Sequence, residues 1–403
     1  MSWRMVLGWA LVAVILGGCS TPQETFAHLR TPPPQPPQPP ARAGAEVVVP
    51  GIPPEAPPVP LTETPPKPAV DLPVPKDIAQ TATPQADSGS VVDVSRPEGL
   101  VPNPAPSLAV IAGDWVDLGA WLQERGWSSF HPVPHGKDLR HESDGPGGTI
   151  AVLPGQKKTW WNGTQVWFGF EPRLEKGRIK IHRLDLAAHC LPLMSGSVAT
   201  DLAARSVVID AGHGGRNAGT RSISGNRHEK EFTLDWALRL KALLESRGWK
   251  VTLTRTNDVD LSLAERVDRT EVSDAVLFLS LHFNSAFPNR EAAGLETYSV
   301  TPRGMASHVI RDFADEPTRS FPNNAHDAVN LRLALAVHRS ILGMTGQADR
   351  GVRRARFMDV LRWQNRPAIL IEGGYLSSPQ EAARIQSPEF RQKLAEAVAA
   401  ALP

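Results

Sequence analysis

The fold is decided by Ser206-Val207-Val208-Ile209-Asp210-Ala211-Gly212-His213-Gly214-Gly215. Its apolar first half is typical of a strand buried on both faces of a parallel sheet, and a polar, glycine-rich turn follows at once. Similar strand patterns alternate with amphipathic helix patterns further along the chain: strands at 250–254, 275–281 and 367–371, and helices at 233–247 and 389–402. We therefore predict an α/β domain over residues 204–403, with a central, mostly parallel sheet flanked by helices.

Polar side chains follow these predicted strands where each strand ends. His213 follows the first strand, His282 and Asn284 end the strand at 275–281, and Glu372 follows the last, while Glu229 opens a helix. Ligands of open α/β sheets bind beyond the carboxyl ends of the strands. Taken singly, a strand-end histidine is often structural, and Glu229 is typical of a carboxylate at a helix N-terminus. Together, two histidines and one glutamate form a common ligand set for catalytic zinc.

The motifs around these residues resemble the zinc-dependent N-acetylmuramoyl-L-alanine amidases, cell-wall amidase family 3. The resemblance covers about residues 205–402 and lies in these segments: Val208 to Gly215, Glu229-Lys230, Leu253-Thr254-Arg255, Ser280 to Asn284, and Ile369 to Ser377. It implies one zinc ion held by His213, Glu229 and His282, with Glu372 as the catalytic carboxylate. The implied reaction is hydrolysis, by zinc-activated water, of the amide between the lactyl group of N-acetylmuramic acid and L-alanine.

One ambiguity concerns the glutamate ligand, because His228 and Glu231 flank Glu229. The register of the family selects Glu229, which precedes Lys230 and the helix. A zinc peptidase that cuts within the stem peptide, and a non-catalytic peptidoglycan-binding lipoprotein, are the alternative functions.

Four further residues are candidates for the surroundings of the site. Asp210 and Asn284 are expected to orient the ligand histidines, because such histidines usually form a hydrogen bond through their second ring nitrogen. Capping of local turns is the alternative. Arg255 and Arg353 are expected either to pair with carboxylates of the stem peptide or to form structural salt bridges.

A long irregular segment is expected over residues 302–330. Long loops in compact domains are often lids or walls of a binding site. We expect it to border the cleft, with Glu316 as an inhibitory contact to zinc, or else to be a passive insertion.

A small α+β unit is expected over residues 106–195. Its signals are a helix at 117–125, a strand at 149–153, a hairpin centred on Asn162-Gly163 and a strand at 178–182. The layout resembles the copper amine oxidase N-terminal-like domain. Its tryptophans serve either as core or as a surface for glycan: Trp115, Trp121, Trp127, Trp160, Trp161 and Trp167.

The N-terminal segment has the features of a bacterial lipoprotein. Residues 1–18 combine Arg4 with a short apolar run, which is typical of a signal peptide. The sequence Leu16-Gly17-Gly18-Cys19 resembles a lipobox and predicts lipidation of Cys19. Ser20, rather than aspartate, favours the outer membrane of a Gram-negative bacterium, with the chain facing the periplasm. Most of the 38 prolines lie within residues 19–105, which predicts a disordered, semi-extended linker.

Charge and cysteine content exclude several classes of protein. The chain has 43 Lys and Arg against 42 Asp and Glu, so a nucleic-acid binder with a large basic surface is not expected. The two cysteines exclude a disulfide framework and a multi-cysteine zinc site. The expected partners are therefore peptidoglycan and, through Cys19, a membrane, and the sequence does not identify a protein activator.

Overall fold

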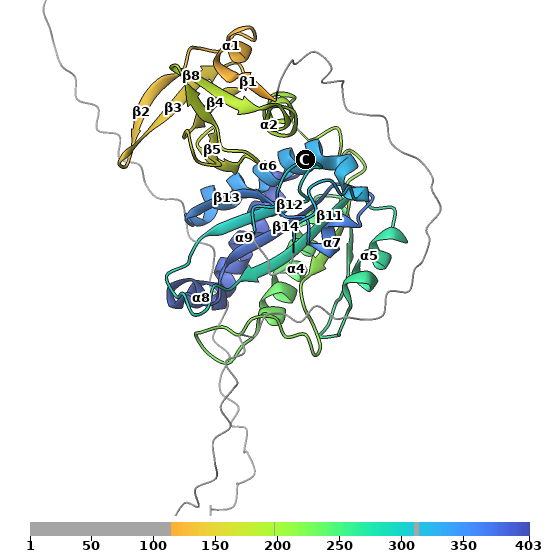
Figure 1. The fold of residues 1–403 in the computed structure, drawn as a ribbon. Coiled ribbons are helices and arrows are strands. Elements are labelled where there is room, and N and C mark those ends of the chain that lie inside the picture. The colour runs from red at the N-terminus through yellow and green to blue at the C-terminus, as the bar shows by residue number, and fades with distance from the viewer. Residues whose placement is uncertain (1–113, 197, 310–313) are drawn as a thin grey trace, which may run out of the picture. The chain divides into compact units, whose positions relative to one another are not determined.

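The computed structural model describes residues 114–403 except 197 and 310–313 (Figure 1). The predicted signal peptide, Cys19 and the proline-rich linker lie outside the described residues. Among the helices of the described part, none is both long enough and apolar enough to cross a membrane.

A parallel sheet forms the centre of the C-terminal domain. Its first four strands lie in the order β10 (Lys250–Leu253), β9 (Ser206–Ala211), β11 (Leu277–Asn284) and β14 (Ala368–Tyr375), and all run parallel. Two strands that the sequence analysis missed continue the sheet. β12 (Leu295–Ser299) runs antiparallel to β14, and β13 (Asp349–Arg354) is parallel to β12. The predicted mostly parallel sheet is confirmed, with one reversal at β12.

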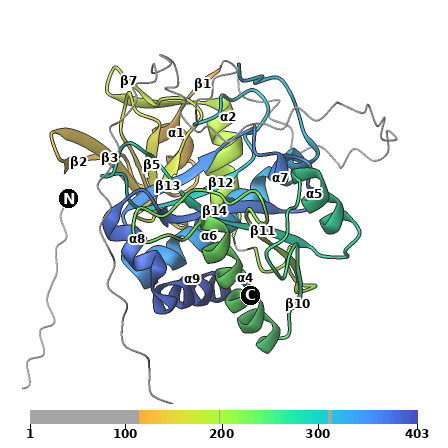
Figure 2. The same ribbon diagram turned by 90° about the horizontal axis from the view of Figure 1, so that it is seen from below.

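Helices cover both faces of this sheet (Figures 1 and 2). The alternation of side chains along β9 sends Val207 and Ile209 into the larger core and Val208 into the smaller one. The larger core is closed by α4 (Glu229–Ser246), α6 (Asp327–Thr345) and α9 (Pro388–Ala401). The opposite face carries α5 (Leu263–Glu271) and α7 (Asp359–Arg362), and α8 (Pro379–Gln386) follows β14. The predicted flanking helices are thereby confirmed.

The N-terminal unit is built of short antiparallel strands, as its hairpin signal predicts. β2 (His131–His135), β3 (Asp138–Gly145), β4 (Gly148–Val152), β5 (Lys158–Trp161) and β6 (Thr164–Trp167) form a meander. A second, three-stranded sheet contains β1 (Trp115–Asp117), β8 (Arg178–His182) and β7 (Arg173–Glu175), beside α1 (Leu118–Gln123). The short helices α2 (Arg183–Asp185), η1 (Leu186–Cys190) and α3 (Leu191–Met194) lead toward β9.

The meander joins the catalytic sheet instead of standing apart from it. Val166 of β6 pairs with Val352 of β13, so the sheet contains eleven strands within the described residues. The division into 106–195 and 204–403 stays a prediction, as does the copper amine oxidase resemblance. Three of the six tryptophans, Trp127, Trp160 and Trp161, are buried, which favours their role as core.

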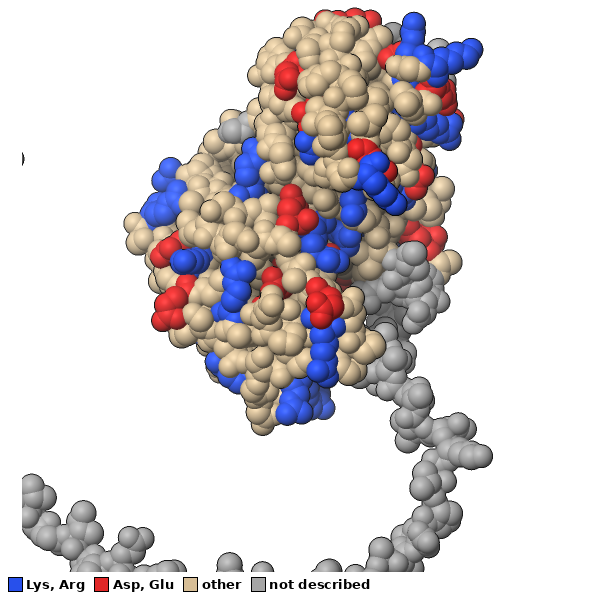
Figure 3. Space-filling model, turned by 90° about the vertical axis from the view of Figure 1, so that its left-hand side faces the viewer, with Lys and Arg blue, Asp and Glu red and all other residues tan. Residues whose placement is uncertain are grey.

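Both signs of charge are interspersed on the face of the molecule in Figure 3. This mixture matches the near balance of basic and acidic residues in the sequence.

Candidate active site

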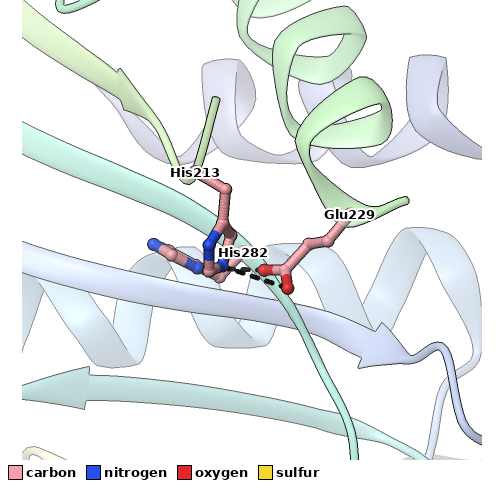
Figure 4. A group of neighbouring side chains, drawn as sticks. All are labelled: His213, Glu229 and His282. Carbon is pink, nitrogen blue, oxygen red and sulfur yellow. Dashed lines mark hydrogen bonds and ion pairs between the residues drawn. The ribbon is translucent and has the colours of Figure 1, made fainter. Parts of the chain in front are cut away.

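Three side chains meet at the carboxyl edge of the parallel strands (Figure 4). His213 follows β9, His282 lies near the end of β11, and Glu229 is the first residue of α4. The Glu229 carboxylate lies 3.1 Å from His213 Nε2 and 3.0 Å from His282 Nδ1. One potential ligand atom from each residue lies within 4.8 Å of the others. We call these three residues the triad, and their ligand atoms lie close enough together to hold a single metal ion.

The electrostatics of the triad favour an ionised carboxylate. Burial of Glu229 acts to raise its pKa, but the charges and hydrogen bonds of His213 and His282 outweigh burial and lower it well below its usual range. The backbone amides of Thr220 and Phe283 also donate to the two carboxylate oxygens, at 3.1 and 3.0 Å. A charged carboxylate between two imidazoles is suited to bind a cation.

The start of α4 resolves the ambiguity between neighbouring residues. Glu231 accepts a hydrogen bond from the backbone amide of His228 at 2.9 Å and pairs with Arg227 at 2.8 Å. These contacts close the first turn of the helix. Helix α4 begins one turn before the predicted start at 233, and this places Glu229, not Glu231, in the triad.

Two glycines allow the triad to pack this closely. A Cβ on Gly212 would lie 2.3 to 2.7 Å from ring atoms of His282. A Cβ on Gly219 would lie 2.7 Å from His213 and 2.8 Å from Glu229, and Gly219 also has a φ of +68°. Such distances exclude any side chain at either position.

Sequence reasoning missed the residue that orients His213. Asn217 Oδ1 lies 2.8 Å from His213 Nδ1, the ring nitrogen that faces away from Glu229. This contact fixes the orientation of the imidazole ring. His213 has a φ of +61°, an uncommon backbone conformation for a residue other than glycine. The Gly214–Asn217 bridge holds this turn. The only available signal was the short spacing between His213 and Asn217 in a glycine-rich turn.

Glu372 lies beside the triad. On β14 it is in register with His282 of the parallel strand β11, and on its other side with Glu296 of β12. Residues in register on adjacent strands project from the same face, with backbones about 4.8 Å apart. The sheet thus places Glu372 next to His282, one member of the triad.

Asp210 does not orient a histidine ring. Its buried carboxylate accepts hydrogen bonds from Thr254 Oγ1 at 2.7 Å, Ser280 Oγ at 2.8 Å and Arg266 Nη1 at 2.6 Å. Arg266 in turn donates to the carbonyl of His213 at 2.7 Å. The expectation for Asp210 was wrong because its side chain points to the face covered by α5, and it supports the backbone of the turn instead.

Asn284 and Arg353 meet at Glu296 rather than at a histidine or an open surface. Asn284 Nδ2 donates to Glu296 Oε2 at 2.9 Å, and Arg353 pairs with Glu296 Oε1 at 3.0 Å. Arg353 also lies over the ring of Trp167, 4.1 Å from its centroid. Asn284 Oδ1 accepts a hydrogen bond from the backbone amide of Ser285 at 2.8 Å, so local capping, the alternative to orienting a histidine, describes Asn284. For Arg353 the salt-bridge alternative describes the structure.

The buried guanidinium of Arg255 binds three backbone carbonyl groups. It donates to the carbonyls of Ala211, Gly212 and Lys230 at 2.8 to 2.9 Å. Burial, with the charge of Arg266, lowers its pKa to about 10. Neither expected role holds, because the guanidinium joins β9 to α4 and is enclosed by protein.

The chain leaves β12 at the edge of the sheet opposite the triad. Because β12 runs antiparallel to β14, the chain after Ser299 exits near the start of β14, away from Glu372. Within the described residues Glu316 pairs with Arg319 at 3.5 Å and is not part of the triad. The segment 302–330 ends earlier than expected, at η2 (Pro322–His326) and α6. No ion pair of Glu316 with the triad occurs in the described residues, and whether this segment borders the cleft or is a passive insertion stays a prediction.

Comparison with known proteins agrees with this geometry. Residues 207–403 match the family model described as N-acetylmuramoyl-L-alanine amidase. The chain is 30% identical over 214 residues to the N-acetylmuramoyl-L-alanine amidase LytC of Bacillus subtilis, covering 51% of this chain and 37% of that protein. It is 28% identical over 216 residues to AmiA of Escherichia coli, covering 48% and 74%.

Among solved structures, the catalytic domain of CwlV from Bacillus (Paenibacillus) polymyxa is 31% identical. The match covers 49% of this chain and 95% of that one, with a TM-score of 0.40. The chain thus spans little more than a third of LytC but nearly all of the CwlV catalytic domain. Through residues 207–403 the chain belongs to the N-acetylmuramoyl-L-alanine amidase family, whose members are peptidoglycan hydrolases.

Proposed function

We propose that this protein is a zinc-dependent N-acetylmuramoyl-L-alanine amidase. Its substrate is the peptidoglycan amide between the lactyl group of N-acetylmuramic acid and the L-alanine of the stem peptide. The observation that carries the proposal is the triad with Glu372 in register beside His282. Family membership supports the same reaction.

The triad fits zinc by the chemistry of its donors. Two imidazole nitrogens and one carboxylate oxygen, from His213, His282 and Glu229, are a ligand set of catalytic zinc sites. One ion per catalytic domain is proposed. When bound, zinc supplies Lewis-acid chemistry, since it lowers the pKa of water and polarises a carbonyl oxygen.

The residues of the chain then perform the proton transfers. Glu372 accepts a proton from the attacking water, whose oxygen forms a bond to the lactyl carbonyl carbon. As the bond between carbon and nitrogen breaks, Glu372 returns this proton to the alanine nitrogen. The products are a lactyl carboxylic acid on the glycan and a stem peptide with a free amino terminus. Asn217 holds the ring of His213 during these steps. Arg255 and Arg266 hold the turn that carries His213 through hydrogen bonds to its backbone carbonyl groups.

Digestion of purified peptidoglycan with and without a chelator tests the proposal. We expect stem peptides with a free L-alanine amino terminus in mass spectra of the products. Chelator should abolish their release, and added Zn²⁺ should restore it. Cleavage within the stem peptide would instead identify a peptidase, and binding without any cleavage would identify a wall-binding protein.

We further propose that the chain is anchored through lipidated Cys19 to the periplasmic face of a Gram-negative outer membrane. The support is the sequence before Cys19, with its charged start, short apolar run and small residues. In a Gram-negative host we expect the wild-type chain in the outer-membrane fraction and a Cys19→Ser variant outside it. Ser20→Ala is the matched control and should stay membrane-bound. Wild-type protein that fractionates without membrane would contradict the anchor.

A further inference from the structure

A second charged cluster lies next to the catalytic glutamate. Glu296 of β12 is in register with Glu372, and it binds two arginines of β13. Arg350 Nε donates to Glu296 Oε1 at 2.8 Å, and the Arg353 guanidinium lies 3.0 Å from the same oxygen. The proposed reaction assigns no task to this cluster.

Glu296 is the fixed centre of the cluster. Its side chain is 2% exposed, and its second oxygen accepts hydrogen bonds from Asn284 Nδ2 at 2.9 Å and Tyr298 Oη at 2.8 Å. Burial acts to raise the pKa of Glu296, but Arg353 and Arg350 outweigh burial and lower it. The Glu296 carboxylate therefore holds both guanidinium groups in place.

The two arginines differ in what remains available to a ligand. Arg353 is 15% exposed and is held between Glu296 and the ring of Trp167. Arg350 is 34% exposed, and its guanidinium lies 5.0 Å from the ring centroid of Tyr375. In the described part of the chain its hydrogen bond to Glu296 uses Nε alone. The two terminal amino groups of Arg350 are thus available. A guanidinium that is held through Nε is suited to bind a carboxylate through its terminal nitrogens.

The spacing of the strands sets how far the Glu296–Arg350 pair lies from the triad. Two strand spacings, about 10 Å, separate the backbones of His282 and Glu296, and Arg350 reaches the Glu296 carboxylate from β13, the next strand. An extended peptide covers that distance in about three residues. The first acidic group within this reach on the leaving side of the scissile amide is the free α-carboxylate of the D-glutamate that follows L-alanine in the stem peptide.

We propose that Arg350 is a specificity-determining residue that binds this carboxylate of the stem peptide. The inference rests on the proposed amidase function and adds a charge requirement to it. The enzyme then favours stem peptides with D-glutamate over those in which the same carboxyl group is amidated to D-isoglutamine.

The test uses two disaccharide tripeptides that differ only in this acid or amide. For the wild-type enzyme we expect kcat/KM to be about 10- to 100-fold higher on the acid than on the amide. This ratio corresponds to the free energy of one charge-assisted hydrogen bond. Arg350→Met should lose that preference by slowing cleavage of the acid, with little change on the amide. Arg350→Lys should keep part of the preference because a point charge remains.

Lys250→Met is the charge-matched control. Lys250 lies at the opposite ends of the strands and pairs with exposed Asp274, so its loss should leave the preference intact. Thermal unfolding of each variant checks that it is folded. Equal rates of the wild-type enzyme on both substrates, or an equal loss on both in Arg350→Met, would overturn this inference and leave the amidase function standing. If the wild-type enzyme cleaves neither substrate but the chain binds peptidoglycan, the proposed function itself fails, and this inference with it.

Discussion

Replacing Glu372 with glutamine is expected to reduce turnover on peptidoglycan by about 10²- to 10⁴-fold, the contribution typical of a general acid–base. Glutamine keeps the shape of the side chain but cannot accept the proton of the attacking water. The triad does not include Glu372, so bound zinc should stay at one ion per chain. Product release, measured by mass spectrometry, and metal analysis of the same sample check both parts.

Glu396→Gln is the matched control for this variant. Glu396 is an exposed residue of α9, where it accepts a hydrogen bond from Gln392. Its replacement removes the same charge and should leave turnover unchanged. Near wild-type activity of Glu372→Gln would refute the assigned mechanism, and loss of zinc in that variant would show that Glu372 acts as a ligand.

His213→Ala is expected to lose both zinc and activity. Removing this ring leaves Glu229 and His282 as two ligands, one fewer than the three protein ligands of a catalytic zinc site with its fourth position open to water. The loss of activity should be at least as large as the factor of about 10²–10⁴ for the general base, because water activation is lost together with the metal. Metal analysis after dialysis and the peptidoglycan assay measure the two effects.

The neighbouring histidine provides the control. His228 precedes Glu229 but contributes to the first turn of α4 through its backbone amide, so His228→Ala should retain zinc. If His213→Ala kept full zinc content, the triad would not be the metal site. If His228→Ala lost its zinc, the choice of ligands at the start of α4 would be wrong.

The fold and the chemical residues were largely readable from the sequence. Apolar runs such as Val207 to Ile209 are typical of strands buried on both faces, and the residues that follow parallel strands gather at one edge of the sheet. This local rule predicts that His213, His282 and Glu372 lie at the same edge, and the family resemblance supplied their roles. Glu229 needed the register of the family as well, because His228 and Glu231 lie next to it in the chain.

The surroundings of the site depend on contacts between distant segments, and there the sequence was a poor guide. A sequence does not distinguish an arginine that binds backbone carbonyl groups, like Arg255, from one whose terminal amino groups are available, like Arg350. Only burial and neighbours distinguish them. The same holds for Asp210, whose partners come from three other segments.

From the sequence by itself, apolar periodicity predicted the strands and the edge where ligands bind, and the family resemblance named the residues expected to carry the chemistry there. The tertiary structure alone decided what supports them. The reversal of β12 places Glu296 beside Glu372 and directs the chain after Ser299 toward the start of β14. Strand direction follows from pairing across the whole domain, which no local pattern of residues encodes.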